Sequence, residues 1–188
     1  MSKRRRVTIV PKRDKFYQDW HIKKTQTIAN VDEEWAIKVP RPLYAPPAGK
    51  YYAVEIHAIE WKFIHEEHDG QRLRTWIALT YSPRSGKTPF LTGPGDPENL
   101  FWADWFNNDE HGHGASGVKQ DSHRSRAIFT DDHGLGKLVC GDNIYLQVSQ
   151  TETGGGVILD VGLKISYTFT SVSCSDYVEE LAAQLTSS

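Results

Sequence analysis

The sequence contains few cysteines and no long apolar run. Its two cysteines, Cys140 and Cys174, are far apart and lack the spacing of a metal site or a redox motif. We therefore expect free thiols, which neither cross-link the fold nor indicate an oxidising compartment. No stretch of about 18 apolar residues is present, and the basic N-terminus lacks the apolar segment of a signal peptide. The sequence thus predicts a soluble protein with no membrane partner.

Complete catalytic motifs are also missing. Residues 85–88 read SGKT, the end of a phosphate-binding loop, but Tyr81 occupies the position of the glycine that such a loop requires. Gly114 and Ser116 match the start of a nucleophile elbow, but Val118 replaces its second glycine. We therefore predict that the protein is not an enzyme and has no catalytic residues and no cofactor.

One histidine pair keeps a metal site open as an alternative. His111 and His113 lie in the segment HGHG, with acidic residues on either side. An HxH pair on a β-sandwich is similar to the metal site of the cupins, which place a glutamate shortly after the second histidine. This chain has Gly117 and Val118 there. We therefore favour a polar loop and predict no metal site, and a cupin-like metal enzyme is the least favoured alternative.

The sequence does contain a regular alternation of apolar and polar residues. It is clearest in residues 157–169, where every odd position is apolar and the even positions are mostly small or polar. A period of two predicts a strand with one buried face and excludes a helix. At about 3.3 Å per residue this strand would cross a whole sheet. We expect it to be an inner strand of an antiparallel sandwich.

A second long strand is predicted at residues 51–64. Its apolar phase changes near Ala58, which indicates a β-bulge. Residues 65–70 read HEEHDG and are typical of a hairpin turn. We therefore expect the strand 51–64 to pair with the strand predicted at 73–81.

The rest of the chain predicts shorter elements. Strands are expected within residues 16–38, 124–130, 138–140 and 143–151, separated by loops that are rich in glycine and proline. After Val172 the apolar residues recur at helical spacing, and Ser175 or Asp176 can cap the helix. This helix would lie either on its own subunit or on a neighbour.

Together these elements predict an all-β fold, an eight-stranded antiparallel jelly-roll sandwich with a basic N-terminal arm and a short C-terminal helix. The expected division is a basic arm at residues 1–24, a jelly-roll domain at 25–174 and a C-terminal helix or tail at 175–188.

The net charge of −2 conceals an uneven distribution. Residues 1–24 contain two acidic residues and nine basic ones, Lys3, Arg4, Arg5, Arg6, Lys12, Arg13, Lys15, Lys23 and Lys24. Their net charge of +7 leaves −9 for the remainder of the chain. A basic arm on an acidic body predicts that the arm binds a polyanion. If the arm is not the binding surface, the next candidates are Lys50, Arg72, Arg74, Arg124 and Arg126.

The pattern resembles one family of proteins. The basic arm and the long loops occur together with the segments TDDHGLG (130–136), GDNIYLQVSQTETGG (141–155) and LDVGLKISYTFTSVS (159–173). This combination is similar to the single-jelly-roll capsid proteins of small non-enveloped viruses, and most of all to those of circular single-stranded DNA viruses.

The resemblance implies a structural protein that assembles with identical subunits into a closed icosahedral shell. The arm would bind single-stranded nucleic acid, expected to be DNA, through phosphate contacts, and the outer loops would meet a host receptor that the sequence does not identify. Subunit contacts are expected at four aromatic residues, Phe101, Trp102, Trp105 and Phe106. The protein would be found in the virion, and the basic residues 3–6 also fit a signal for entry into the host nucleus.

Six tryptophans support an alternative function. If exposed, their rings would stack on sugars, as in a carbohydrate-binding β-sandwich module; if buried in strands and interfaces, they are ordinary core residues. We favour the second interpretation, so that the capsid function remains the first hypothesis.

Overall fold

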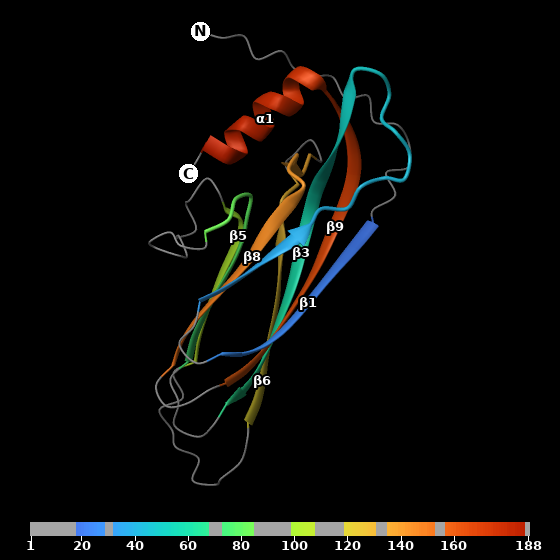
Figure 1. Ribbon diagram of the computed structural model, residues 1–188. Helices are drawn as coiled ribbons and strands as arrows, with labels where there is room; N and C mark the ends of the chain where they lie inside the picture. Colours follow the sequence, from blue (N-terminus) through green and yellow to red (C-terminus); the bar gives the residue numbers. More distant parts are fainter. Residues whose placement is uncertain are drawn as a thin grey trace.

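The computed structural model describes residues 18–28, 32–67, 73–84, 99–107, 119–130, 135–152 and 157–186 (Figure 1). Within these residues the chain forms strands and one C-terminal helix. The elements are β1 (Gln18–Ile28), β2 (Asp32–Lys38), β3 (Lys50–Glu67), β4 (Leu73–Thr80), β5 (Asn99–Asn107), β6 (Lys119–Ile128), β7 (Lys137–Val139), β8 (Asn143–Glu152), β9 (Val157–Ser173) and α1 (Cys174–Thr186).

The strands form two antiparallel sheets that face each other. Sheet A has the order β1-β9-β3-β6, with the short β7 also paired to β3, and sheet B has the order β2-β8-β4-β5. The chain therefore changes sheet repeatedly, and its last long strand lies beside its first. This strand order defines a jelly roll. The predicted all-β jelly-roll sandwich is confirmed, with β7 added to its eight main strands.

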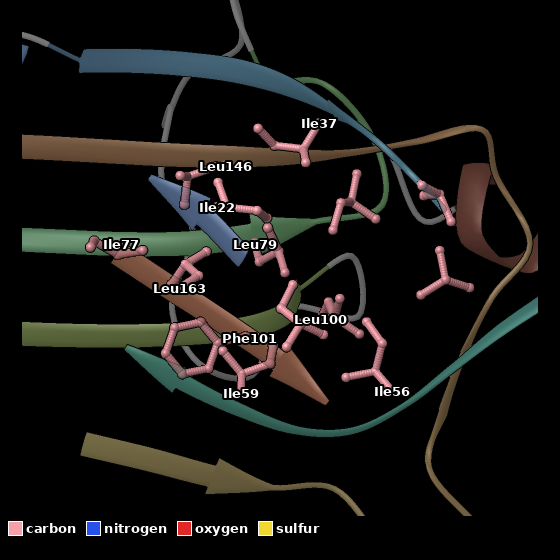
Figure 2. Packing of buried hydrophobic residues seen from close by; sticks show 14 of the residues in the cluster. Ile22, Ile37, Ile56, Ile59, Ile77, Leu79, Leu100, Phe101, Leu146 and Leu163 are labelled. Atoms are coloured by element: carbon pink, nitrogen blue, oxygen red, sulfur yellow. The ribbon is translucent and has the colours of Figure 1, made fainter. Parts of the chain in front are cut away.

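Strand β9 has the central position that its alternation predicts. It pairs with β1 on one side and with β3 on the other. Val161, Leu163 and Ile165 are each at most 2% exposed and point toward sheet B. Figure 2 shows Ile22, Ile59 and Leu163 of sheet A packed against residues of sheet B that include Ile77, Leu79 and Leu146.

The predicted pairing of strand 51–64 with strand 73–81 is wrong. Strand β3 pairs with β6, β7 and β9, whereas β4 pairs with β5 and β8 in the other sheet. Strand β3 also continues to Glu67, through residues that we expected in a hairpin turn. The chain crosses between sheets after β3, because each strand buries its apolar face by facing the other across the core.

The predicted bulge in β3 is confirmed. The register between β3 and β9 shifts between Ile56 and Ala58, so that His57 is the extra residue. The carbonyl oxygen of His57 accepts a hydrogen bond from the amide of Phe129 at 2.8 Å. A backbone group that leaves the ladder is thus satisfied by the segment after β6.

The C-terminal helix is confirmed, but its cap differs from the prediction. Ser173, not Ser175 or Asp176, precedes the helix, and its Oγ accepts a hydrogen bond from the amide of Asp176 at 3.2 Å. Ser173 and Asp176 have the spacing of a capping box. The helix lies at one end of the sandwich (Figure 1), where Tyr177 stacks on Tyr51 with 4.8 Å between the ring centroids.

Both cysteines are free thiols, as expected, and Cys140 is buried while Cys174 is exposed. None of the described helices has the length and apolar character needed to cross a membrane.

Candidate nucleic-acid interface

The outer face of sheet A carries two rows of charged residues. Because Val161, Leu163 and Ile165 point into the core, the alternate positions 162 and 164, occupied by Gly162 and Lys164, face outward. The register sets Lys23 of β1 opposite Gly162 on one side and Lys62 of β3 opposite it on the other. Arg124 of β6 follows next to Lys62 in the same row.

A second row lies two residues further along each strand, on the same face of the sheet. It contains His21, Lys164, Glu60 and Arg126, which come from β1, β9, β3 and β6 in that order. The two rows together bring basic residues from four strands onto one face of the sheet. Far apart in the sequence, these residues are neighbours only through the register.

Three acidic residues described on this face each lie beside a basic residue. Lys23 Nζ lies 3.7 Å from Asp160 Oδ2, Lys164 Nζ lies 3.3 Å from Asp19 Oδ2, and Arg126 Nε lies 3.7 Å from Glu60 Oε1. Exposed pairs of this kind contribute at most about 1 kcal/mol, so the cations can turn toward another anion. Of the lysines described on this face, Lys62 is the one without an ion pair to a described residue, so it is the most available to a ligand.

Asp19 is held in its charged form. Burial raises the pKa of its carboxyl group, but hydrogen bonds with Lys164 and Ser166 outweigh this effect and leave the pKa below its usual value. The Ser166 hydroxyl donates to Asp19 Oδ1 at 3.1 Å. The start of β1 is thereby joined to the middle of β9 on the outer face.

A hollow of about 430 Å³ lies over Gly162. Its lining consists of residues from the three adjacent strands β1, β9 and β3, namely His21, Ile22, Lys23, Glu60, Trp61, Lys62, Asp160, Gly162, Leu163 and Lys164. This volume falls in the range of about 300–1,000 Å³ that is typical of ligand sites. A second hollow, of about 350 Å³, borders Arg126 and Ser166 further along the same face.

The glycine creates the first hollow. A Cβ atom at position 162 would meet nothing nearer than the carbonyl oxygen of Lys62, at 3.9 Å. The site therefore has room for a side chain that the sequence does not supply. Glycine in a strand interior lowers stability and often marks a place where a ligand or another backbone approaches closely. Gly162 therefore indicates that the backbone here is left open to such a contact.

The predicted arm residues are only partly described. Lys3, Arg4, Arg5, Arg6, Lys12, Arg13 and Lys15 lie outside the described residues. Strand β1 begins at Gln18, so Lys23 and Lys24 lie in the sheet and not in an extended arm. The strand extends this far because Ile22 alternates into the core, where it is 6% exposed.

The four aromatic residues predicted at subunit contacts occupy different places in β5. Phe101 belongs to the core of its own chain, with its ring centroid 4.6 Å from that of Trp61. Trp102 is half-buried and has the opposite phase. Trp105 and Phe106 are in the same strand, but their side chains lie outside the described set.

Lys62 and Lys164, the two lysines that complete the rows, were not predicted as site residues. Each is a single charge at an outward position of a long strand, with no local signature of a site. Arg124 and Arg126 were predicted, as secondary candidates. Of the others, Arg74 lies in sheet B, where its guanidinium pairs with Asp104 at 2.7 Å and lies over the Trp76 ring.

Metal ligands do not gather in the part of the chain that the structure describes. His111 and His113, the proposed alternative, lie outside that part.

No family model and no curated protein sequence matches this chain. Among solved structures, it is similar to apo VP1 of New Jersey polyomavirus, with 9% identity and a TM-score of 0.47 over 83% of this chain and 100% of that one. It is also similar to VP1 of Trichodysplasia spinulosa-associated polyomavirus in complex with GM1 oligosaccharide, at 8% identity and a TM-score of 0.39, covering 82% and 94% of the two chains. The VP1 pentamer of human polyomavirus 6 gives 8% identity and a TM-score of 0.39, covering 82% and 95%. Likenesses at this level carry no information about what this chain binds.

Proposed function

We propose that this protein is a viral coat protein that assembles with identical subunits into a small icosahedral shell and packages single-stranded nucleic acid. The observation that carries the proposal is the division of charge on a jelly roll: +7 in residues 1–24 and −9 in the remainder. A sandwich of this kind can contact neighbouring subunits through its two broad sheet faces and through the loops at its two ends. The basic segment supplies charge for a polyanion.

Exposed apolar side chains support the assembly part of the proposal. Leu43 and Tyr44, in the loop between β2 and β3, are 106% and 66% exposed, and Val178 of α1 is 62% exposed. Exposed apolar residues that cluster in a loop are typical of interaction sites. We assign the loop of residues 40–47 to subunit contacts, together with Trp102 and Trp105 of β5.

The carbohydrate-binding alternative loses most of its support. It requires exposed tryptophans, yet no tryptophan whose side chain is described is exposed. Trp20, Trp35 and Trp61 pack against the core, and the guanidinium of Arg74 covers Trp76. A flat ring available for a sugar is therefore missing among these side chains.

Packaging by the arm is tested by its removal. A variant without residues 1–15 keeps every described strand, so it is expected to fold and to assemble. The ratio of absorbance at 260 and 280 nm of its particles should fall well below that of the full chain. Binding to unrelated oligonucleotides should also depend less on salt. The slope of log affinity against log salt should become shallower by about 0.7 for each phosphate contact removed. Equal nucleic-acid content in both kinds of particle would show that packaging does not depend on the arm.

A further inference from the structure

We infer that the outer face of sheet A binds the phosphate backbone of single-stranded nucleic acid, with a phosphate seated in the hollow over Gly162 between Lys23 and Lys62. This inference rests on the proposed function and adds a second contact surface, located on the sandwich itself.

The geometry of the hollow suits an anion held from two sides. Lys23 and Lys62 lie in the strands on either side of β9, both opposite Gly162. With strands about 4.8 Å apart, their Cα atoms are about 10 Å from each other across the glycine. Two long side chains reach a phosphate at the midpoint easily, and the glycine leaves the floor free of any side chain.

The charges of the face favour an anion over a cation. Asp160 and Glu60 border the hollow, but each lies beside a base, with Lys23 Nζ 3.7 Å from Asp160 Oδ2 and Arg126 Nε 3.7 Å from Glu60 Oε1. The ion pair of Lys23 with Asp160 is long, and the Lys23 side chain is 74% exposed. Asp160 therefore keeps the lysine near the hollow and leaves its ammonium group able to contact a second anion. Lys62 and Lys164 add positive charge to a body whose net charge is otherwise negative.

The shape indicates a polymer and not a single small anion. The second hollow, beside Arg126 and Ser166, continues the first along β9. Ser166 is four positions from Gly162, or about 13 Å at about 3.3 Å per residue. A run of several nucleotides fits this distance. Among the described side chains, no exposed Phe, Tyr or Trp ring borders either hollow, so the contacts are to phosphates and independent of base sequence.

A second copy of the chain is the competing occupant. Its body is acidic and would also be attracted to a basic face. The basic arm of a neighbour is not, because it carries the same charge as Lys62. Replacement of Lys62 distinguishes the two occupants. If a second copy binds this face, the replacement should impair assembly even without nucleic acid; if nucleic acid binds it, the replacement should weaken nucleic-acid binding.

Two variants of the full chain and a matched control test the inference. Lys62→Gln removes the available cation, and Gly162→Thr fills the hollow without changing any charge. Lys38→Gln is the control, because Lys38 is likewise an exposed lysine in a strand, but in sheet B. The probe is a fluorescein-labelled thymidine 20-mer, followed by anisotropy from 50 to 300 mM NaCl. Thermal melting confirms folding, and Gly162→Thr should melt no lower than the parent because threonine favours strands.

We expect both hollow variants to weaken binding roughly threefold to tenfold near 100 mM salt and to reduce the slope of log affinity against log salt by about 0.7. Lys38→Gln should change the affinity less than twofold. If Lys62→Gln has no larger effect than Lys38→Gln, or if Gly162→Thr binds like the parent, the inference is wrong.

Assembly separates this failure from failure of the proposed function. If particles form and only loss of residues 1–15 reduces binding, the shell proposal stands and the contact on sheet A is refuted. If Lys62→Gln abolishes particle formation in the absence of nucleic acid, the face is a subunit contact, which also refutes the inference. A full chain that neither binds the 20-mer nor forms particles contradicts both proposals.

Discussion

The side chain of Gln184 in α1 hydrogen-bonds to the backbone of Cys140 in the way that a neighbouring strand would. Its Oε1 accepts from the Cys140 amide at 3.3 Å, and its Nε2 donates to the carbonyl oxygen of Leu138 at 2.8 Å. Gln184 is 6% exposed, so these bonds are shielded from water. The helix therefore packs on its own subunit. The sequence had left open whether it lies there or on a neighbouring subunit.

Replacement of Gln184 by leucine should destabilise the protein. The change leaves the buried Cys140 amide and the partly buried Leu138 carbonyl without these partners, which costs up to about 1–3 kcal/mol per group. The free energy of unfolding from urea denaturation measures the effect. Ala182→Ser, at an exposed position of the same helix, is the control and should change little. A Gln184→Leu variant as stable as the control would mean that the helix is not docked as described.

Arg41 connects the loop after β2 to the turn before β8. Its guanidinium donates to the carbonyl oxygens of Tyr52 and Gly141, each at 3.0 Å, and to Asp142 Oδ1 at 2.8 Å. Arg41→Lys should lower the free energy of unfolding by about 1–3 kcal/mol, because an ammonium group cannot reach the separated carbonyls together.

The matched variant for Arg41 is Asp142→Asn. It weakens only the ion pair and leaves the backbone carbonyls in place, and the Asp142 side chain is 87% exposed. A loss below about 1 kcal/mol is expected for such a pair. If the two variants unfold at the same urea concentration, the ion pair and not the carbonyl contacts holds the loop.

The two cysteines should differ strongly in reactivity. Burial raises the pKa of the Cys140 thiol to about 11, with a further contribution from the charge of Glu180, whereas Cys174 is exposed. At pH 8 iodoacetamide should therefore modify Cys174 first and Cys140 only after unfolding. Mass spectrometry of the peptides measures both sites. Equal labelling in the native protein would contradict the burial of Cys140.

The same shift predicts how stability depends on pH. The folded pKa of Cys140 is raised above its ordinary value of 9.0, so the folded state retains a proton that the unfolded state loses. Stability should therefore decrease as the pH rises from about 9 to about 11. Cys140→Ala removes this thiol, and its unfolding free energy should fall less over the same pH interval. An identical pH profile would assign the loss to other groups, such as Tyr81, whose pKa burial also raises.

Leu43 and Phe101 allow assembly to be separated from folding. Leu43→Ser changes a fully exposed side chain and should leave the melting temperature unchanged while it reduces particle yield. Phe101→Ser instead removes a core ring and should cost about 3–5 kcal/mol of stability. Light scattering and thermal melting on the same samples give both quantities. Normal particles from Leu43→Ser would remove this loop from the proposed subunit contacts.

Local periodicity was enough to predict most elements of the fold. The alternation of residues 157–169 correctly indicated an inner strand, and the change of phase near Ala58 correctly indicated the bulge. Both signals depend only on which side of a strand is buried. The predicted pairing of the second strand failed for the same reason, because alternation identifies a buried face but not the sheet to which the strand belongs.

The hollow over Gly162, on the outer face of sheet A, could not be predicted from the alternation of apolar and polar residues. Lys23, Lys62 and Gly162 become neighbours only when β1, β9 and β3 adopt one register, and a slip of one residue in β1 or β3 would turn its lysine toward the core. The helix cap failed on a finer scale. Ser171, Ser173 and Ser175 alternate around the start of the helix, and the sequence alone does not select the one that ends the strand.

The most direct test of the proposed function is negative-stain electron microscopy of the full-length protein after nuclease treatment, with analytical ultracentrifugation of the same samples across salt and pH. We predict uniform closed particles that contain nuclease-protected nucleic acid and dissociate or empty as salt increases. Only monomers or dimers under every condition, without protected nucleic acid, would contradict the assignment of this jelly roll as a coat protein.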